Sequence, residues 1–199
     1  MPSRPSAQPA VPRHRDDPLE LAVGLALVLF HTPLRARILR VVVTADGLVA
    51  RLDGGQELRF GGRVYSVSTA KRGLGEQNGS LCTPRGRHIV RAKIGAGLPL
   101  NTVFMRRRPT GETWTPALDA RYPGRDWMLT RILWLSGCEV GRNRLGDVDT
   151  MRRYIYIHGS PDRAEMGKPG SIGCIRMRNA DILDLFDLVQ PYTPVDIKP

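Results

Sequence analysis

The pattern of apolar and polar positions predicts a domain built mainly from β-strands. Short segments that alternate between apolar and polar residues, or are continuously apolar, are separated by Gly, Pro and Asp residues, which is typical of strands joined by turns. Asp46-Gly47 separates two such segments and favours a hairpin turn. The predicted strands are 38–43, 48–52, 63–69, 88–94, 102–106, 128–135, 153–157 and 195–197.

One helix is predicted close to the C-terminus. Asn179 is a favourable N-cap residue, Asp181 lies in the first turn where the helix dipole favours negative charge, and Pro191 ends the segment. Four apolar residues fall on one helical face and predict packing against a core: Ile182, Leu185, Phe186 and Val189. A single helical turn is also expected at 117–122, so the fold class is mainly β with one or two short helices.

The chain divides into three regions. Residues 1–18 are rich in proline and predict a flexible tail, because such a composition cannot bury a core. Residues 19–37 begin with an apolar run that is too short for a transmembrane helix. This run favours a short packing helix. It also resembles a poor signal peptide, with arginines ahead of it but acidic residues directly before it. Residues 38–199 form the predicted folded domain.

The charge of the chain is strongly positive. The net formal charge is +11 and the sequence pI is about 10.4, carried mostly by arginine. Such a surface attracts polyanions, including nucleic acid, anionic membranes and acidic cell-wall polymers, although an arginine-rich solvated surface explains it equally well. Because no nucleic-acid-binding motif accompanies the charge, no nucleic-acid partner is expected, and a basic nucleic-acid-binding module is the weaker alternative.

Candidate chemistry is concentrated between residues 154 and 177. His158 ends a predicted strand, and Cys174 follows it by 16 residues, after a glycine-rich turn. A thiol and an imidazole brought together in this way are the minimum equipment for cysteine nucleophilic catalysis. Gly173 allows the backbone to approach a substrate, and the amides of Gly173 and Cys174 are candidate oxyanion donors. Each of the two residues taken alone has a simple structural explanation as a buried core residue.

The same segment resembles the active-site motif of the L,D-transpeptidase (YkuD-like) catalytic domain. His158-Gly159, followed by Ser171-Ile172-Gly173-Cys174-Ile175-Arg176-Met177, matches the family pattern. The upstream segments Val67-Ser68-Thr69-Ala70 and Cys82-Thr83-Pro84-Arg85-Gly86 resemble two further family motifs in the expected order. The resemblance implies an L,D-transpeptidase-like β-sandwich or barrel.

The resemblance also implies a reaction. Cys174 would attack a peptidoglycan stem tetrapeptide to form a thioester, and His158 would be the base, in cell-wall cross-linking or remodelling. Carbapenem-type β-lactams would be acylating inhibitors. The chemistry implies a location in the cell envelope or periplasm, although a cytoplasmic location stays open because the signal peptide is poor.

Four further residues are assigned to the predicted site. Ser171 is a candidate for fixing the turn or polarising the site, and Gly159 for close approach and for orienting His158 through its carbonyl. Arg176 is a candidate ligand of a stem carboxylate, or alternatively a brace for the loop. Tyr156 shares a strand face with His158 and either borders the cleft or packs in the core.

One residue departs from the family pattern. The usual histidine before Gly-Cys is replaced by Ile172. Losing a polar group near a reacting centre costs about 1–3 kcal/mol, so a catalytically impaired protein that binds the cell wall is an alternative function. The predicted chemistry needs no cofactor. No metal is expected either, because Asp147-Val148-Asp149 lacks the order of an EF-hand loop and the cysteines lack zinc-ligand spacing.

Overall fold

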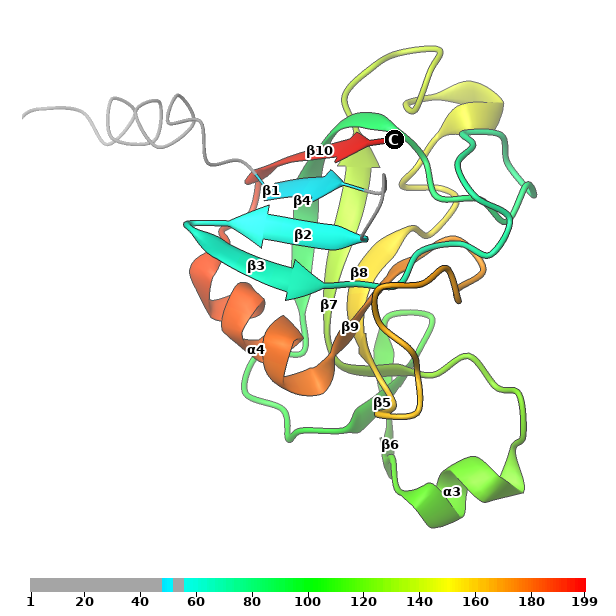
Figure 1. The fold of residues 1–199 in the computed structure, drawn as a ribbon, viewed down its shortest axis with the longest axis vertical. Coiled ribbons are helices and arrows are strands. Elements are labelled where there is room, and N and C mark those ends of the chain that lie inside the picture. The colour runs from blue at the N-terminus through cyan, green and yellow to red at the C-terminus, as the bar shows by residue number, and fades with distance from the viewer. Residues whose placement is uncertain (1–47, 52–55) are drawn as a thin grey trace, which may run out of the picture. The chain divides into compact units, whose positions relative to one another are not determined.

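The computed structural model of the chain describes residues 48–51 and 56–199. The ten strands in these residues join in one mixed sheet, and two α-helices and one short 3₁₀ helix accompany it (Figure 1). The first strands are β1 (Leu48–Arg51), β2 (Glu57–Phe60), β3 (Arg63–Ser66), β4 (Gly86–Ile94), β5 (Thr102–Met105) and β6 (Arg108–Thr113). They are followed by α3 (Pro116–Arg121), β7 (Met128–Gly137), η1 (Gly146–Val148), β8 (Tyr156–Ser160), β9 (Ile175–Arg178), α4 (Asn179–Leu188) and β10 (Pro194–Lys198). The prediction of a mainly β fold with one or two helices is confirmed.

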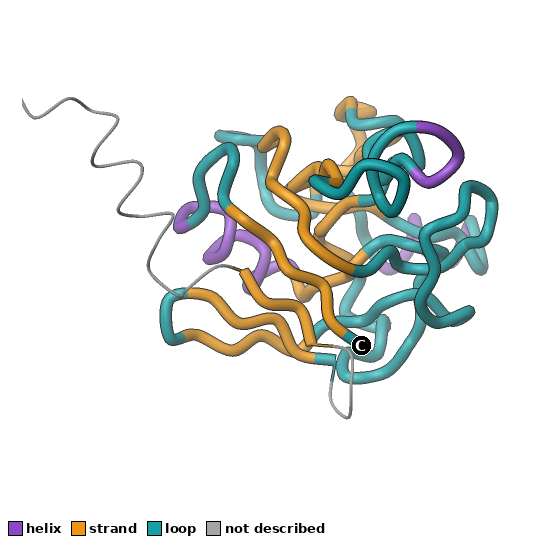
Figure 2. Tube along the Cα trace, turned by 90° about the horizontal axis from the view of Figure 1, so that it is seen from above, coloured by secondary structure: helices purple, strands orange, loops and turns teal. Residues whose placement is uncertain are grey.

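The sheet branches at β7. The main path runs β3-β2-β1-β10-β4-β7-β5-β6, while β8 pairs with β7 and β9 pairs with β8. Most neighbouring strands are antiparallel, but β8 and β9 are parallel, with His158 opposite Arg176. A parallel pair requires a long connection, and here that connection carries the residues between His158 and Cys174. In Figure 2 most of the longer loops gather at the right of the view, beyond the ends of the strands.

Most predicted strands are present. The ranges 88–94, 102–106, 128–135 and 195–197 coincide with β4, β5, β7 and β10 to within a few residues. Strand β10 joins β1 to β4, so the C-terminal segment closes the sheet. The strand predicted at 153–157 lies instead at 156–160, so His158 is in the middle of β8 and not at its end. Strands β2, β6 and β9 were not predicted.

Several predictions fall on residues outside the described part of the chain. These are the tail at 1–18, the apolar segment at 19–37, the strand at 38–43 and the Asp46-Gly47 turn. Strand β1 is present, and its two edges are occupied by β2 and β10. None of the helices in the described residues is both long and apolar enough to cross a membrane.

The helix α4 covers one face of β7, β8 and β9 and closes the main hydrophobic core. The predicted apolar face is buried as expected, with Ile182, Leu185 and Val189 fully inside. The predicted N-cap was wrong, because the helix is capped by Arg178 without a side-chain bond. The Asn179 side chain instead accepts a hydrogen bond from Thr130 and donates one to Asn101. This buried network ties the start of α4 to β7 and to the loop before β5.

Candidate active site

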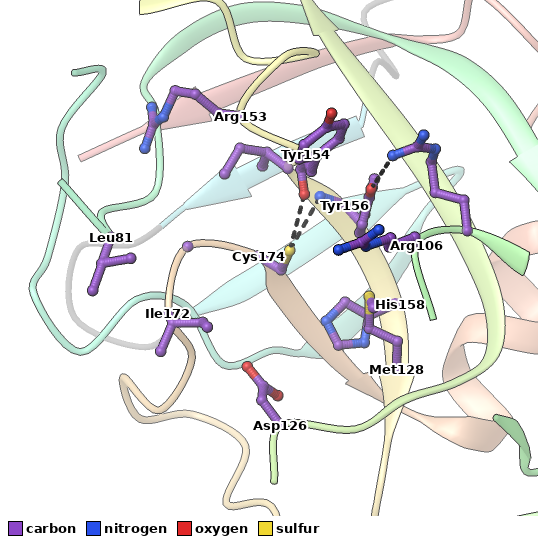
Figure 3. Close-up of a pocket in the computed structure, with 13 residues that line it drawn as sticks. Leu81, Arg106, Asp126, Met128, Arg153, Tyr154, Tyr156, His158, Ile172 and Cys174 are labelled. Carbon is purple, nitrogen blue, oxygen red and sulfur yellow. Dashed lines mark hydrogen bonds between the residues drawn. The ribbon is translucent and has the colours of Figure 1, made fainter. Parts of the chain in front are cut away.

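A cavity of about 580 Å³ lies beside β8 and the start of β9. His158, Tyr156 and Cys174 line it together with Gly173 and Ile172 (Figure 3). The alternation along β8 explains this placement, since Ile157 enters the main core while Tyr156 and His158 turn to the cavity. The structure therefore brings the predicted nucleophile and base into one cavity, with Tyr156 on the same face as His158.

The turn that carries Cys174 is fixed by hydrogen bonds from its own serine. Ser171 is buried, and its hydroxyl donates to the Cys174 carbonyl at 2.6 Å and accepts from the Gly173 N–H at 3.2 Å. Gly173 has a φ of 140°, which side chains rarely adopt, and a Cβ there would lie 3.2 Å from Ile155. The backbone at this position therefore requires glycine.

The two upstream motif segments wrap around the same turn. Ser68 exchanges two backbone hydrogen bonds with Arg176, and the Thr69 carbonyl accepts from the N–H of Ser171. The Thr83 hydroxyl donates to the Gly173 carbonyl at 2.9 Å and accepts from the Ala70 N–H at 3.1 Å. These contacts explain why both upstream segments accompany the turn that carries Cys174, since both help to hold it in place.

The Cys174 thiol rests against the backbone. Its sulfur accepts a hydrogen bond from the Tyr156 N–H at 3.4 Å, and the thiol donates to the Tyr154 carbonyl at 3.5 Å. Within the described residues, no hydrogen bond joins this thiol to His158. Burial raises the pKa of Cys174 to about 12, and the Asp126 carboxylate adds to this, while the Tyr156 amide and two arginines oppose it. Cys174 therefore rests as a neutral thiol.

The His158 imidazole is neutral and has a defined tautomer. The imidazole is almost fully buried, and burial lowers its pKa, with the nearby Asp126 carboxylate opposing that shift. Nδ1 lies 2.8 Å from the Gly159 carbonyl, the contact expected from the sequence. Because a carbonyl can only accept, Nδ1 carries the hydrogen and Nε2 keeps a free lone pair.

Gly159 is required by close packing. A Cβ at this position would lie 2.4 Å from the Asn179 Oδ1 and 2.7 Å from the Leu129 carbonyl. Neither is the free end of a flexible side chain, because Asn179 is held in the network with Thr130 and Asn101. Replacement of Gly159 would therefore displace β8 and its histidine.

Two of the predicted roles do not match this geometry. The Gly173 N–H is already bound to Ser171, so it is not free to hold an oxyanion, whereas the Cys174 N–H has no acceptor among the described residues. Arg176 does not line the cavity. Its guanidinium forms an ion pair with Asp126 at 2.6 Å and is mostly buried, so it acts as the brace and not as an open carboxylate ligand.

Asp126, Arg106 and Arg107 are among the cavity residues that sequence reasoning missed. Asp126 lies in a segment rich in Pro and Gly, and it pairs with Arg176, which lies 50 residues further along the chain. Arg106 and Arg107 belong to a run of three arginines, and both line the cavity from the turn between β5 and β6. No local signal in the sequence links these positions to Cys174. Among the described residues there is no cluster of side chains suited to hold a metal ion.

Comparison with known proteins identifies the family pattern over most of the chain. Residues 37–197 match the family model described as YkuD, the L,D-transpeptidase catalytic domain. A putative L,D-transpeptidase YkuD from Bacillus licheniformis is 42% identical over 48 residues, which are 24% of this chain and 29% of that protein.

The chain is also similar in part to solved structures. An L,D-transpeptidase from Mycobacterium smegmatis matches with a TM-score of 0.43 and 18% identity, over 76% of this chain and 58% of that one. An L,D-transpeptidase from Xylanimonas cellulosilytica matches with a TM-score of 0.42 and 20% identity, over 78% of this chain and 62% of that one. The matched region thus spans less than two thirds of the length of these relatives.

Proposed function

The chain belongs to the L,D-transpeptidase catalytic domain family, and on that premise we propose that it is a cysteine-dependent acyltransferase of peptidoglycan stem peptides. The observation that supports the proposal is the placement of the two motif residues in one cavity, with His158 on β8 and Cys174 directly before the adjacent strand β9. The substrate would be a tetrapeptide stem, and the site of action would be the cell envelope.

The first step would form a thioester. Rotation of the Cys174 side chain away from the Tyr154 carbonyl would let His158 Nε2 take the thiol proton. The resulting thiolate would attack the carbonyl of the diamino acid in the stem. A thiol with a pKa of about 12 needs this base, since almost none of it is ionised at neutral pH. The Cys174 N–H would donate to the oxyanion.

His158, now protonated, would give its proton to the departing amine of the terminal D-alanine, and the tetrahedral intermediate would collapse to the thioester. The second step would transfer the acyl group. The thioester would then react with an amine of an acceptor stem or with water. Ile172 stands where the family has a histidine and is exposed at the cavity wall, so His158 would serve in both steps without that second imidazole.

Intact mass spectrometry after incubation with a carbapenem tests the proposal. Opening of the β-lactam ring by Cys174 should add the mass of one carbapenem to the native chain and none to Cys174→Ala. Cys138→Ala, which removes an exposed thiol outside the cavity, should still be acylated. No adduct on the folded native chain would reject the enzymatic proposal and favour a protein that binds the cell wall without acylating.

A further inference from the structure

Two arginines occupy the turn between β5 and β6 in an unfavourable backbone conformation. Arg106 has a φ of 47° and Arg107 a φ of 69°, so both adopt the left-handed region. Hairpin turns of this kind favour Asn and Gly, and a residue held in this region costs about 1–3 kcal/mol. Both arginines line the cavity that holds Cys174. Backbone strain located at an active-site cavity suggests that these side chains serve the site.

Arg107 is fully engaged by aromatic side chains. Its guanidinium lies 4.3 Å from the ring centroid of Trp134 and 4.8 Å from that of Tyr154, and it donates to the Tyr156 hydroxyl at 3.0 Å. These contacts hold the turn against the wall of the cavity. Arg107 is therefore a positioning residue for its neighbour.

The other charged residues of the cavity already have partners. Arg153 donates to the carbonyls of Gly75, Glu76 and Cys82 and to the Ser80 hydroxyl. Asp126 is paired with Arg176. Arg106 differs, because it has no ion pair or side-chain hydrogen bond within the described part of the chain. Figure 3 shows its side chain extending from the hairpin into the cavity toward Cys174.

We propose that Arg106 binds a carboxylate of the donor peptide, so that the site selects donors in which this carboxylate is free and not amidated. The proposal rests on the proposed function and names the chemistry that the donor must carry. A guanidinium presents two parallel N–H donors that match a carboxylate, and such a charge-assisted pair next to the nucleophile orients the scissile bond.

Two groups of the donor carry this chemistry. One is the C-terminal carboxylate of the leaving residue, and the other is the side-chain carboxylate of the diamino acid. Three synthetic tetrapeptides distinguish them: the free acid, the C-terminal carboxamide and the side-chain carboxamide. Binding of each to the full chain carrying Cys174→Ser is measured by isothermal titration calorimetry, because this measurement needs no turnover.

The free acid should bind about tenfold to a hundredfold more tightly than one of the two carboxamides, which identifies the carboxylate that Arg106 holds. Arg106→Asn should abolish the difference, because Asn tolerates the left-handed conformation but carries no charge. Its thermal midpoint should stay at or above that of the parent. Arg108→Gln, which removes a positive charge of the same hairpin outside the cavity, should keep the full preference.

Three outcomes would overturn the proposal. These are equal binding of all three peptides, no binding of any of them at millimolar concentration, and a preference that survives Arg106→Asn. Failure of the proposed function is seen separately, as absence of carbapenem acylation in the chain that retains Cys174. If the protein prefers the free acid through Arg106 but is not acylated by the carbapenem, the carboxylate site at Arg106 is supported and the proposed enzymatic function is rejected.

Discussion

Asp126 and Arg176 form a mostly buried ion pair, 2.6 Å long, that influences the pKa values of both Cys174 and His158. The carboxylate raises the pKa of Cys174 and of His158, whereas the guanidinium lowers both. Because the two charges lie together, their effects on the site largely oppose one another. The pair therefore braces the loop after Cys174 and leaves burial as the main cause of both pKa shifts.

Replacement of Asp126 by Asn should separate the contribution of the ion pair to stability from its effect on the pKa of Cys174. The variant leaves the mostly buried Arg176 guanidinium without its carboxylate, so the free energy of unfolding should fall by about 1–3 kcal/mol. It also removes a charge that raises the pKa of Cys174, so alkylation of this thiol by iodoacetamide should become faster. Chemical denaturation and mass spectrometry measure the two results.

Glu165→Gln is the matched control for this variant. Glu165 pairs with Lys168 at 3.3 Å, but both side chains are more than two thirds exposed. Exposed pairs contribute little, so the change in unfolding free energy should stay below about 0.5 kcal/mol. An Asp126→Asn protein as stable as the parent would contradict the bracing role of the ion pair. Slower alkylation would contradict the effect of Asp126 on the pKa of Cys174.

The pH dependence of alkylation should report the neutral thiol. In the chain carrying Cys82→Ser and Cys138→Ser, Cys174 is the one remaining cysteine. Its pKa of about 12 means that the thiolate fraction, and with it the alkylation rate, should still be rising at pH 10. Circular dichroism at each pH checks that the chain stays folded. A plateau near pH 8 would instead indicate a thiolate already paired with a protonated His158.

Ile172→His should increase the rate of acylation. Ile172 is 61% exposed at the cavity wall, so the substitution sacrifices little packing and should leave stability within about 0.5 kcal/mol of the parent. A second imidazole beside the nucleophile should raise the rate of carbapenem acylation about tenfold or more, as measured by stopped-flow fluorescence. Leu81→His places the same group at another exposed cavity residue and should have a much smaller effect.

His88 should make the fold sensitive to acid. It is buried, with Nδ1 2.9 Å from the Gly86 carbonyl and Nε2 3.1 Å from the Thr150 hydroxyl, and burial lowers its pKa to about 4. A depressed folded-state pKa means that the unfolded chain binds more protons below about pH 6.5. This contribution to stability is therefore complete above about pH 6.5 and decreases as the pH falls toward 4.

Between about pH 6.5 and 4 the contribution of His88 to the free energy of unfolding should fall by an amount on the order of 3 kcal/mol. Urea denaturation between pH 7 and 4 measures it, and His88→Gln should flatten the profile relative to the parent. His158 contributes with the same sign, because burial lowers its pKa too, so His158→Gln provides the comparison. A profile unchanged by His88→Gln would assign the acid sensitivity to other groups.

The features that were predictable from sequence are those with a local signal. The apolar face of α4 follows helical spacing, and the alternation in β8 correctly places Tyr156 and His158 on one face. The order of the family motifs locates the turn that carries Cys174 before any contact is known. Each of these depends on residues that are close in the chain.

The features that sequence reasoning missed depend on distant contacts. Asn179 has the side chain of an N-cap residue, but Thr130 and Asn101 bind it from positions 49 and 78 residues away. Arg176 looks like a free ligand until Asp126 is placed against it. The strained turn at Arg106 lies where sequence preference would place Asn or Gly, so its conformation is visible only in the structure.

The parallel pairing of β8 with β9 fixes the positions of these two strands relative to each other but does not fix the connection between them. Ile157 faces Ile175 and Ser160 faces Arg178, so the hydrogen-bond register sets where β9 begins, directly after Cys174. The segment 161–166 between them takes no part in that register. Insertions or substitutions there would change a surface loop while Cys174 and His158 keep their positions. The fold thus allows this connection to vary in sequence and length without moving the two motif residues.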